Sequence, residues 1–201
     1  IAVNCAGLTE TLLESELFGH VKGSFTGAYR DAPGVLERAH EGSIFLDEIG
    51  EMSLRMQGML LRFLETGELQ KVGADRVGRR LDVRVIMATN RVLSEIVAQG
   101  LFREDLFYRI NVINIHVPPL RDRRDDIPLL VDHFFEHMGH NGSRPTFTPE
   151  AYVALAAYSW PGNVRELANI VERLLVSGCG PQIGVDDLPI EIRAQRSISF
   201  R

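Results

Sequence analysis

The chain has 201 residues, 45% of them hydrophobic and 24% charged, with a formal net charge of −5 at pH 7. This balance excludes a disordered tail, a collagen-like repeat and a disulfide-stapled miniprotein, and argues against nucleic-acid binding through bulk charge. No apolar stretch approaches the roughly 20 residues needed to cross a bilayer. Cys5 and Cys179 match no zinc or redox spacing. We expect a cytoplasmic protein without a membrane segment, with both cysteines buried as small apolar residues.

The first half alternates short apolar runs with helical patterns, which is typical of an α/β fold with a parallel sheet flanked by helices. Strands are expected at IAVNCA (1–6), GSIFLDEIG (42–50), LDVRVIMATN (81–90) and INVINIHV (110–117). The unbroken apolar run of the second predicts a strand that is buried on both faces. The fourth is predicted from apolar residues that alternate with polar ones, namely Ile113, Ile115 and Val117.

Helical spacing predicts the remaining elements. Two helices lie between the strands, one with the stripe Leu8, Leu12, Leu13 and Leu17 and one capped by Ser53 with the stripe Met56, Leu60, Phe63 and Leu64. From residue 125 the periodicity is purely helical, with the apolar positions Ile127, Leu130, Val131, Phe134 and Met138. A helix capped by Thr148 with Pro149 first, and another after WPGN that ends at Gly178, complete this region.

These patterns divide the chain into three parts. We expect an α/β domain at 1–123, a small all-helical domain at 124–193 and the start of a linker at 194–201. The charged run RDRRDD at 121–126 is interpreted as a solvated hinge. Because the chain starts at Ile1, directly with apolar β-formers, it is expected to be cut from a longer protein.

Polar residues end three of the apolar runs, and in open parallel sheets ligands bind at the carboxyl ends of the strands. An apolar strand that ends in adjacent acids, as at Asp47 and Glu48, resembles a Walker B motif, in which one carboxylate holds Mg²⁺ and the other polarises water. Thr89 and Asn90 end another strand, where an amide could orient water or sense a γ-phosphate, and Asn4 ends the first. The structural alternatives are a plain strand exit for the acids and an Asx turn for Thr89 and Asn90.

Two arginines and a glycine-rich loop are further candidates. Arg103 and Arg109 lie six residues apart in FREDLFYRI, a placement that suits cations reaching a phosphate on another subunit, or else surface ion pairs. In GSFTGA, Gly23 and Gly27 permit backbone angles that favour a switching loop, and an aromatic exposed at its tip, Phe25, offers a large apolar contact. The alternative is a flexible surface loop.

The segments ESELFGHVKGSFTGA, GSIFLDEIGEM, FREDLFYRINV, VPPLRDRRDDI and WPGNVREL follow one another in this order. Together they closely resemble the central AAA+ domain of the sigma-54-dependent transcriptional activators, the bacterial enhancer-binding proteins, over practically the whole chain. The most specific element is GSFTGA, which is similar to the family's GAFTGA signature. Ser24 replaces the usual alanine, and we expect this change to be tolerated.

The resemblance implies roles for the predicted residues. Asp47 matches the Walker B magnesium ligand, Glu48 the catalytic carboxylate, and Asn4 the asparagine that restrains this glutamate until the ring is engaged. Asn90, with Thr89, matches sensor I. Arg103 and Arg109 match the trans-acting arginines. Arg165 matches sensor II of the helical lid. The loop that touches sigma-54 comprises Gly23, Ser24, Phe25, Thr26, Gly27 and Ala28.

The family also implies an activity and partners. Members are ATPases, with ATP and Mg²⁺ as cofactors, that form homo-oligomeric rings of six or seven subunits and remodel the closed complex of sigma-54 and RNA polymerase. They bind enhancer DNA through a separate domain, which this chain lacks. The chain also lacks the phosphate-binding GxxxxGK[ST] segment. We expect this segment roughly 20 to 30 residues before Asn4, one strand–helix unit away, so the fragment alone is expected to be inactive.

Two other functions fit part of the sequence. A non-catalytic module that binds sigma-54 would account for the missing phosphate loop, although it would need neither Glu48 nor the two arginines. Another AAA+ remodeller would share the acids and the sensors but has no need of GSFTGA. The regulatory signal and the target promoters leave no trace in these residues.

Overall fold

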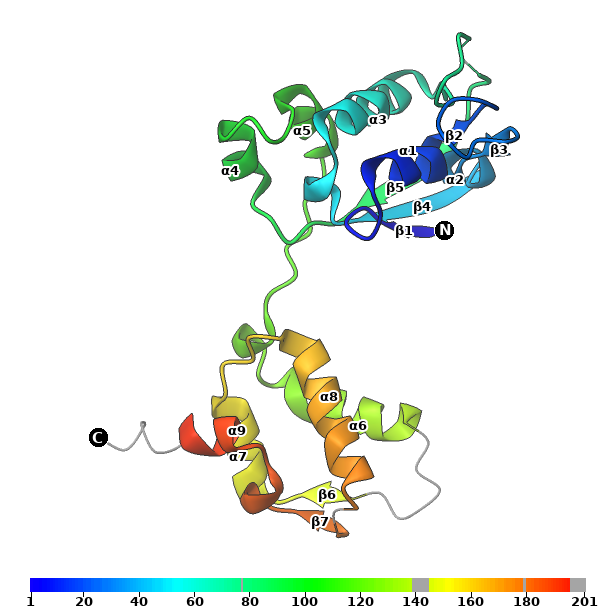
Figure 1. Cartoon of the computed structure of the whole chain (residues 1–201). Helices are drawn as coiled ribbons and strands as arrows, with labels where there is room; N and C mark the ends of the chain where they lie inside the picture. Colours follow the sequence, from blue (N-terminus) through cyan, green and yellow to red (C-terminus); the bar gives the residue numbers. More distant parts are fainter. Residues whose placement is uncertain (77, 139–144, 179, 196–201) are drawn as a thin grey trace. The chain divides into compact units, whose positions relative to one another are not determined.

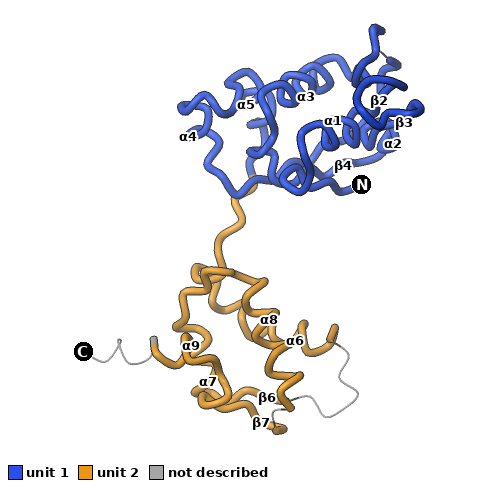
Figure 2. Tube along the Cα trace, viewed as in Figure 1, with its two compact units in different colours: residues 1–114 blue, residues 115–201 orange. Residues whose placement is uncertain are grey.

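The computed structural model describes residues 1–201 except 77, 139–144, 179 and 196–201 (Figure 1). Two compact units divide the chain, residues 1–114 and residues 115–201 (Figure 2). This division lies earlier than the boundary expected near residue 123, because Leu120 already packs in the core of the second unit. The Leu120 amide also donates to Asn163 Oδ1 of that unit at 2.9 Å. Cys179 and most of the expected linker lie outside the described residues.

Unit 1 is built on a three-stranded sheet in the order β1–β4–β5. Its strands are β1 (Ala2–Asn4), β4 (Gly42–Asp47) and β5 (Val83–Met87), and both pairings are parallel. The sequence predicted all three, since each is a short apolar run bounded by turn residues. Parallel pairing brings the carboxyl ends of the three strands to the same edge of the sheet.

The two faces of this sheet differ in burial. Ile44 and Leu46 on β4 are fully buried, whereas Phe45 between them is 39% exposed and Ile86 on β5 is 44% exposed. Side chains alternate between the faces of a strand, and helices α1 (Glu10–Phe18) and α3 (Leu54–Thr66) lie on the same side of the sheet (Figure 1). The prediction of a strand buried on both faces is therefore wrong for β4 in this chain.

The predicted stripe of α3 is confirmed, and that of α1 only in part. Ser53 Oγ caps α3 by accepting from the Met56 amide at 3.3 Å, and Met56, Leu60 and Phe63 are buried. Helix α1 begins only at Glu10, so Leu8 precedes it, and Leu12 points to solvent. The buried face of α1 instead consists of Leu13, Glu14, Leu17 and Phe18.

Short elements complete unit 1. They are β2 (Gly19–His20), β3 (Ala32–Pro33), α2 (Val35–Arg38), the 3-10 turn η1 (Ile49–Glu51), α4 (Leu93–Ala98) and α5 (Glu104–Ile110). The fourth strand predicted at 110–117 is not formed. Val112, Ile113, Ile115 and Val117 are 69–82% exposed. A strand needs a neighbour for its backbone N–H and C=O groups, and none of the described strands pairs with this segment.

Unit 2 packs its helices around its own core. Its helices are α6 (Asp126–His137), α7 (Pro149–Ala157), α8 (Asn163–Val176) and α9 (Ile190–Gln195). The 3-10 turns η2 (Leu120–Asp122) and η3 (Val185–Asp187) precede α6 and α9, respectively. A two-residue parallel ladder links β6 (Thr146–Phe147) to β7 (Gln182–Ile183). The predicted cap of α7 is confirmed, since Thr148 Oγ1 accepts from the Ala151 amide at 3.2 Å.

Glu14 is a buried carboxylate in the core of unit 1. It is 3% exposed, and its Oε1 lies 3.3 Å from Nε of Arg55, whose own side chain is largely exposed. Burial raises the pKa of Glu14 above its usual value, and the attraction of Arg55 only partly opposes this rise. Folding therefore disfavours the ionised form of Glu14 relative to the unfolded chain.

The raised pKa of Glu14 makes its effect on stability depend on pH. Its contribution is fully present below the unfolded pKa and is lost as the pH rises through the higher folded pKa. We expect Glu14→Gln to stabilise unit 1 by about 1 kcal/mol at pH 8, or roughly 2–4 °C in melting temperature. The gain should be smaller at pH 5. Thermal melts of both proteins at the two pH values test this, and an equal or reversed difference would contradict it.

Candidate functional site

The acids and the asparagine predicted from the sequence meet at the carboxyl edge of the sheet. Asn4 ends β1 and Asp47 ends β4, and the two residues are register partners on adjacent strands. Neighbouring strands lie about 4.8 Å apart, so the two side chains start close together. Asn4 Oδ1 accepts from the Ala6 amide at 2.8 Å, which fixes the side chain at the strand end.

Glu48 follows Asp47 in a backbone conformation that few residues adopt. Its φ of 55° lies in the left-handed region, which is costly for a residue with a side chain. The Glu48 amide donates to Asp47 Oδ1 at 3.0 Å, and the chain then enters η1. Both carboxylates are half-buried. The side chain of Glu48 is thus positioned directly after the strand end that carries Asp47.

The end of β5 lies next to the same acids. The Ile49 amide donates to the carbonyl of Ala88 at 3.1 Å, which joins the two strand ends. A Cβ added to Gly50 would lie 3.1 Å from Thr89 Oγ1, so Thr89 faces the backbone that follows Glu48. Thr89 Oγ1 also accepts from the Arg91 amide at 3.1 Å, a local turn of the kind considered as the structural alternative. Asn90 is exposed beside it.

The burial expected for Cys5 is confirmed, and its thiol is affected by the negative charges of the acids at this edge. Cys5 is buried, and its amide donates to the carbonyl of Asp47 at 2.9 Å. Burial first, and then repulsion by Asp47 and Glu48, raise the pKa of the Cys5 thiol to about 12. The thiol is therefore protonated and unreactive at neutral pH.

These strand ends offer oxygen ligands. Magnesium is usually held by one or two carboxylates, waters and phosphate oxygens. The half-buried Asp47 carboxylate, with the Asn4 amide oxygen on the next strand, fits that donor chemistry. Among the described residues no group of three or more His, Cys, Asp or Glu side chains forms a cluster that could hold a metal. Asp47 is thus the residue at this edge whose chemistry fits a magnesium ligand.

Arg103 stands at the start of α5 with its side chain in solution. Its guanidinium donates to both carboxylate oxygens of Asp105, at 3.0 and 2.6 Å. This contact raises the pKa of Arg103 and lowers the pKa of Asp105. Because both side chains are more than 40% exposed, water competes for the pair and another anion can replace Asp105. The predicted alternative of a surface ion pair is thus what the isolated chain adopts.

Arg109 lies in the last turn of α5, where its Nη2 donates to the carbonyl of Leu64 at 2.7 Å. It lines an open cavity of about 670 Å³ together with Arg80, Asp82 and Val83. Val83 begins β5, whereas Thr89 lies beyond the other end of that strand. The structure therefore does not bring Arg109 to the acids of its own chain.

Arg165 is exposed in the first turn of α8, in unit 2. The loop before it is held by its neighbour Glu166, whose carboxylate accepts from the Tyr158 hydroxyl at 3.0 Å and from the Gly162 amide at 2.9 Å. Burial and this hydrogen bond raise the pKa of Tyr158. Trp160, fully buried, donates from Nε1 to the carbonyl of Leu155 at 2.8 Å. The backbone that carries Arg165 is thus fixed by its surroundings.

The GSFTGA loop is held at its base and closed by its own backbone. The Gly23 amide donates to the Ala28 carbonyl at 2.8 Å, and the Ala28 amide donates to the Phe25 carbonyl at 3.0 Å. Gly23 and Gly27 have φ values of 84° and 104°. These are backbone angles that glycine adopts easily and other residues resist, as predicted for this loop. Thr26, between them, is exposed.

Phe25 differs from the exposed tip that was predicted. It is half-buried, and its ring lies edge-on to His20, with the ring centroids 5.0 Å apart. His20 is in turn fixed by the Ser15 hydroxyl, 2.7 Å from its Nδ1. The loop is therefore folded down in this structure. Tyr29, 86% exposed just after the loop, is the freely accessible aromatic of this region.

Ser24 carries a buried hydroxyl for which the described structure provides no hydrogen-bond partner. Its Cβ faces Gly73, where an added Cβ would approach to 2.5 Å, so the segment around Gly73 packs tightly on the loop. The Val21 amide donates to the Val72 carbonyl at 3.1 Å and ties the two segments together. A buried unpaired hydroxyl is unfavourable, so the family's alanine fits this position better than serine does.

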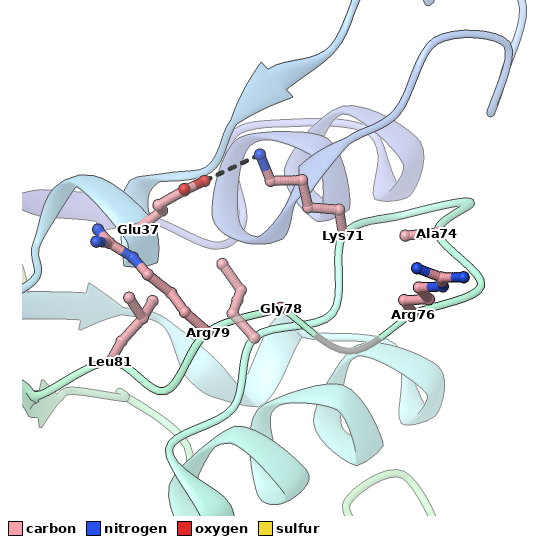
Figure 3. Close-up of a pocket in the computed structure, with 8 residues that line it drawn as sticks. Glu37, Lys71, Ala74, Arg76, Gly78, Arg79 and Leu81 are labelled. Atoms are coloured by element: carbon pink, nitrogen blue, oxygen red, sulfur yellow. Dashed lines mark ion pairs between the residues drawn. The ribbon is translucent and has the colours of Figure 1, made fainter.

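A smaller hollow of about 110 Å³ is lined by Glu37 and by residues near Gly73, and none of the predicted nucleotide residues lines it. Figure 3 shows its lining, in which Lys71 makes an ion pair with Glu37 at 3.0 Å. The side chains of Arg76 and Arg79 point to different sides of the hollow in this view. The two arginines of this hollow therefore do not face one common ligand position.

Among the described residues, no helix combines the length and apolarity that crossing a membrane requires.

Sequence reasoning missed two residues that support this site. Gln57 is fully buried in α3, and Glu166 holds the loop before α8. A signal for Gln57 was present, because it lies three and seven residues before Leu60 and Leu64 and so falls on the apolar stripe of its helix. Nothing in the local sequence showed what either side chain would contact.

Comparisons with known proteins agree with this geometry. Residues 1–116 match the model of the sigma-54 interaction domain, and residues 121–200 match that of the AAA+ ATPase lid domain. The regulatory protein AtoC of Escherichia coli is 52% identical over 195 residues, which cover 96% of this chain and 42% of AtoC. The Nif-specific regulatory protein of Herbaspirillum seropedicae is 54% identical over 175 residues, 86% of this chain and 32% of that protein.

Solved structures give the same result. NtrX of Brucella abortus in complex with ADP superposes with a TM-score of 0.84 at 37% identity, over 96% of this chain and 43% of NtrX. NtrX in complex with ATP gives a TM-score of 0.83 at 38% identity, over 98% of this chain and 45% of NtrX. The chain spans less than half the length of these relatives. The two matched models, which together cover nearly the whole chain, show that it belongs to the sigma-54 interaction domain family of AAA+ proteins and includes that family's lid domain.

Proposed function

We propose that this chain is the motor part of a longer ATPase, called the complete protein below, which remodels the closed complex of sigma-54 and RNA polymerase. The observation that carries the proposal is the pairing of Asn4 with Asp47 at adjacent strand ends, with the left-handed Glu48 directly after them. ATP and Mg²⁺ would be its cofactors. Enhancer DNA would be bound through a domain that is not in these 201 residues.

Each strand-end residue has a distinct role in this proposal. Bound MgATP supplies the phosphoanhydride bond that is hydrolysed. Asp47 holds the metal, and Glu48 accepts the proton of the attacking water. Asn4, one strand away, restrains Glu48, while Thr89 and Asn90 face the γ-phosphate. Arg165 of the lid serves as sensor II.

The arginines of α5 act on a neighbouring subunit in this proposal. Arg103 is exposed and paired with Asp105, and Arg109 donates to the Leu64 carbonyl and lines a cavity with Val83, at the opposite end of β5 from Thr89. Neither guanidinium is bound to an acid of the strand ends, and we assign both to a phosphate on a neighbouring subunit. Cations lent to a neighbour's phosphate require a ring, of six or seven subunits by family resemblance. The Asp105 carboxylate occupies Arg103 until such a phosphate is available.

Mixing subunits tests whether these arginines act in trans. We expect Arg103→Ala or Arg109→Ala to lower the ATPase rate of the complete protein about 10³-fold or more, because the transition-state charge loses a cation. A ring mixed from Arg103→Ala subunits and Glu48→Gln subunits should regain activity, since each supplies what the other lacks. Steady-state ATPase rates of mixtures at fixed total protein measure this. Mixtures that stay as inactive as their parents would exclude action in trans.

The open face of the sheet supports the view that a further strand and helix belong to the complete protein. Ala2, Phe45 and Ile86 are register partners in one row across the three strands, and all three are exposed. Parallel sheets are almost always covered on both faces. A strand and helix bearing GxxxxGK[ST] would cover this row. The complete reading frame tests this directly, and a different sequence at that place would favour the non-catalytic sigma-54-binding module.

A further inference from the structure

We propose that Gln57 is a positioning residue that fixes Arg103 and links it to the backbone that follows Glu48. This inference rests on the proposed function, because it concerns the cation that a subunit lends to its neighbour. Gln57 and Glu14 are the two fully buried polar or charged side chains among the described residues. Unlike Glu14, Gln57 uses its whole amide group in hydrogen bonds within the protein.

The Gln57 amide joins three backbone groups. Its Nε2 donates to the carbonyl of Met52 at 2.8 Å and to the carbonyl of Leu101 at 3.1 Å. Its Oε1 accepts from the Arg103 amide at 2.8 Å. Two carbonyls require the nitrogen and one N–H requires the oxygen, so the partners themselves fix the orientation of the amide.

On one side this network reaches the acids. Met52 closes η1, the 3-10 turn that begins directly after Glu48, and its amide donates to the Ile49 carbonyl at 3.2 Å. The Glu51 amide donates to the Glu48 carbonyl at 3.0 Å. The Met52 carbonyl that Gln57 binds is therefore connected to the Glu48 backbone through a single hydrogen-bonded 3-10 turn.

On the other side the network reaches the base of Arg103. Arg103 is the N-cap residue of α5, and the segment before it is tied to α4, because the Leu101 amide donates to the Ile96 carbonyl at 2.9 Å. Phe102, between the two residues that Gln57 contacts, is buried in the core. The backbone at Arg103 is thus fixed, while the guanidinium remains in solution. A cation that must meet a phosphate on another subunit needs a fixed base and a free end.

The first test measures the backbone at Arg103 in the 201-residue chain. We expect Gln57→Met, which keeps the length of the side chain but cannot make these hydrogen bonds, to speed hydrogen exchange of the Arg103 amide about tenfold or more. Glu14→Gln, a change at the other buried polar residue, should leave exchange of this amide unchanged relative to the slowest core amides of unit 1. Gln57→Leu provides a second variant if Gln57→Met does not fold. An unchanged Arg103 amide in a folded Gln57 variant would overturn the proposal.

The second test measures coupling in the complete protein. Gln57→Met should lower kcat about tenfold while nucleotide Kd stays within about twofold, and it should have no further effect when Arg103 is already alanine. Independent multiplication of the two effects would mean that Gln57 merely supports the fold, and would overturn the proposal. If Arg103→Ala alone leaves kcat unchanged, the proposed function fails, whereas the exchange result still decides whether Gln57 positions the Arg103 backbone.

Discussion

Glu48→Gln in the complete protein is expected to keep nucleotide binding and to lose hydrolysis. The amide has nearly the same shape as the carboxylate, so the left-handed turn and the hydrogen bond from its own N–H to Asp47 Oδ1 can persist. It cannot accept the proton of the attacking water, and removal of a general base typically costs 10²–10⁴-fold in rate. Single-turnover hydrolysis and equilibrium binding of a fluorescent ATP analogue measure the two properties separately.

A matched control for this variant lies in the same turn. Glu51, three residues further on, is an exposed glutamate that makes an ion pair with Arg91. Glu51→Gln should change neither nucleotide binding nor the rate of hydrolysis by more than about twofold. Unchanged turnover in Glu48→Gln would place the general base elsewhere, whereas loss of binding would show that the substitution disturbs the strand end itself.

The strand ends could be predicted from the sequence because their physics is local. Apolar runs that stop at Asn4, Asp47 and Thr89 must surface there, and parallel pairing brings such ends to one edge. The caps Ser53 and Thr148 were predictable for the same reason, since a cap depends on the amides that follow within one turn.

Features that depend on distant partners could not be predicted in this way. The exposed face at Phe45 depends on what covers the sheet, and the segment around Ile113 lacks a strand to pair with among the described residues. Gln57 finds its partners up to 46 residues away, so its helix alone cannot assign them. The position of Phe25 likewise depends on its ring contact with His20, which lies in β2, outside the loop.

This resting position bears on how the loop works. With its ring against His20, Phe25 is only partly exposed to a partner, and Ser24 lies against Gly73. Glycines at both ends allow the loop to leave this state without strain on a side chain. Raising the loop would expose Phe25, and would release the Ser24 hydroxyl from a site where it lacks a partner.

Phe25→Ala or Thr26→Ala in the complete protein is therefore expected to leave ATPase activity largely intact and to abolish sigma-54-dependent transcription. An aromatic anchor at an interface is typically worth 2 kcal/mol or more, so transcript yield should fall roughly 30-fold or more. The ATPase should stay within about threefold of the parent, because neither residue contacts the strand ends or α5. In vitro transcription from a sigma-54 promoter and ATPase assays on the same preparations provide both values.

Two neighbours separate loss of the sigma-54 contact from loss of the loop's resting state. Tyr29→Ala removes a more exposed aromatic close by and should keep transcription. His20→Ala removes the ring on which Phe25 rests but leaves Phe25 in place, and it should retain most of the transcript yield. If His20→Ala abolishes transcription as completely as Phe25→Ala, the aromatic pair matters for the folded-down loop. Full transcription in Phe25→Ala and Thr26→Ala would reject the sigma-54 contact at this loop and favour a remodeller of another protein.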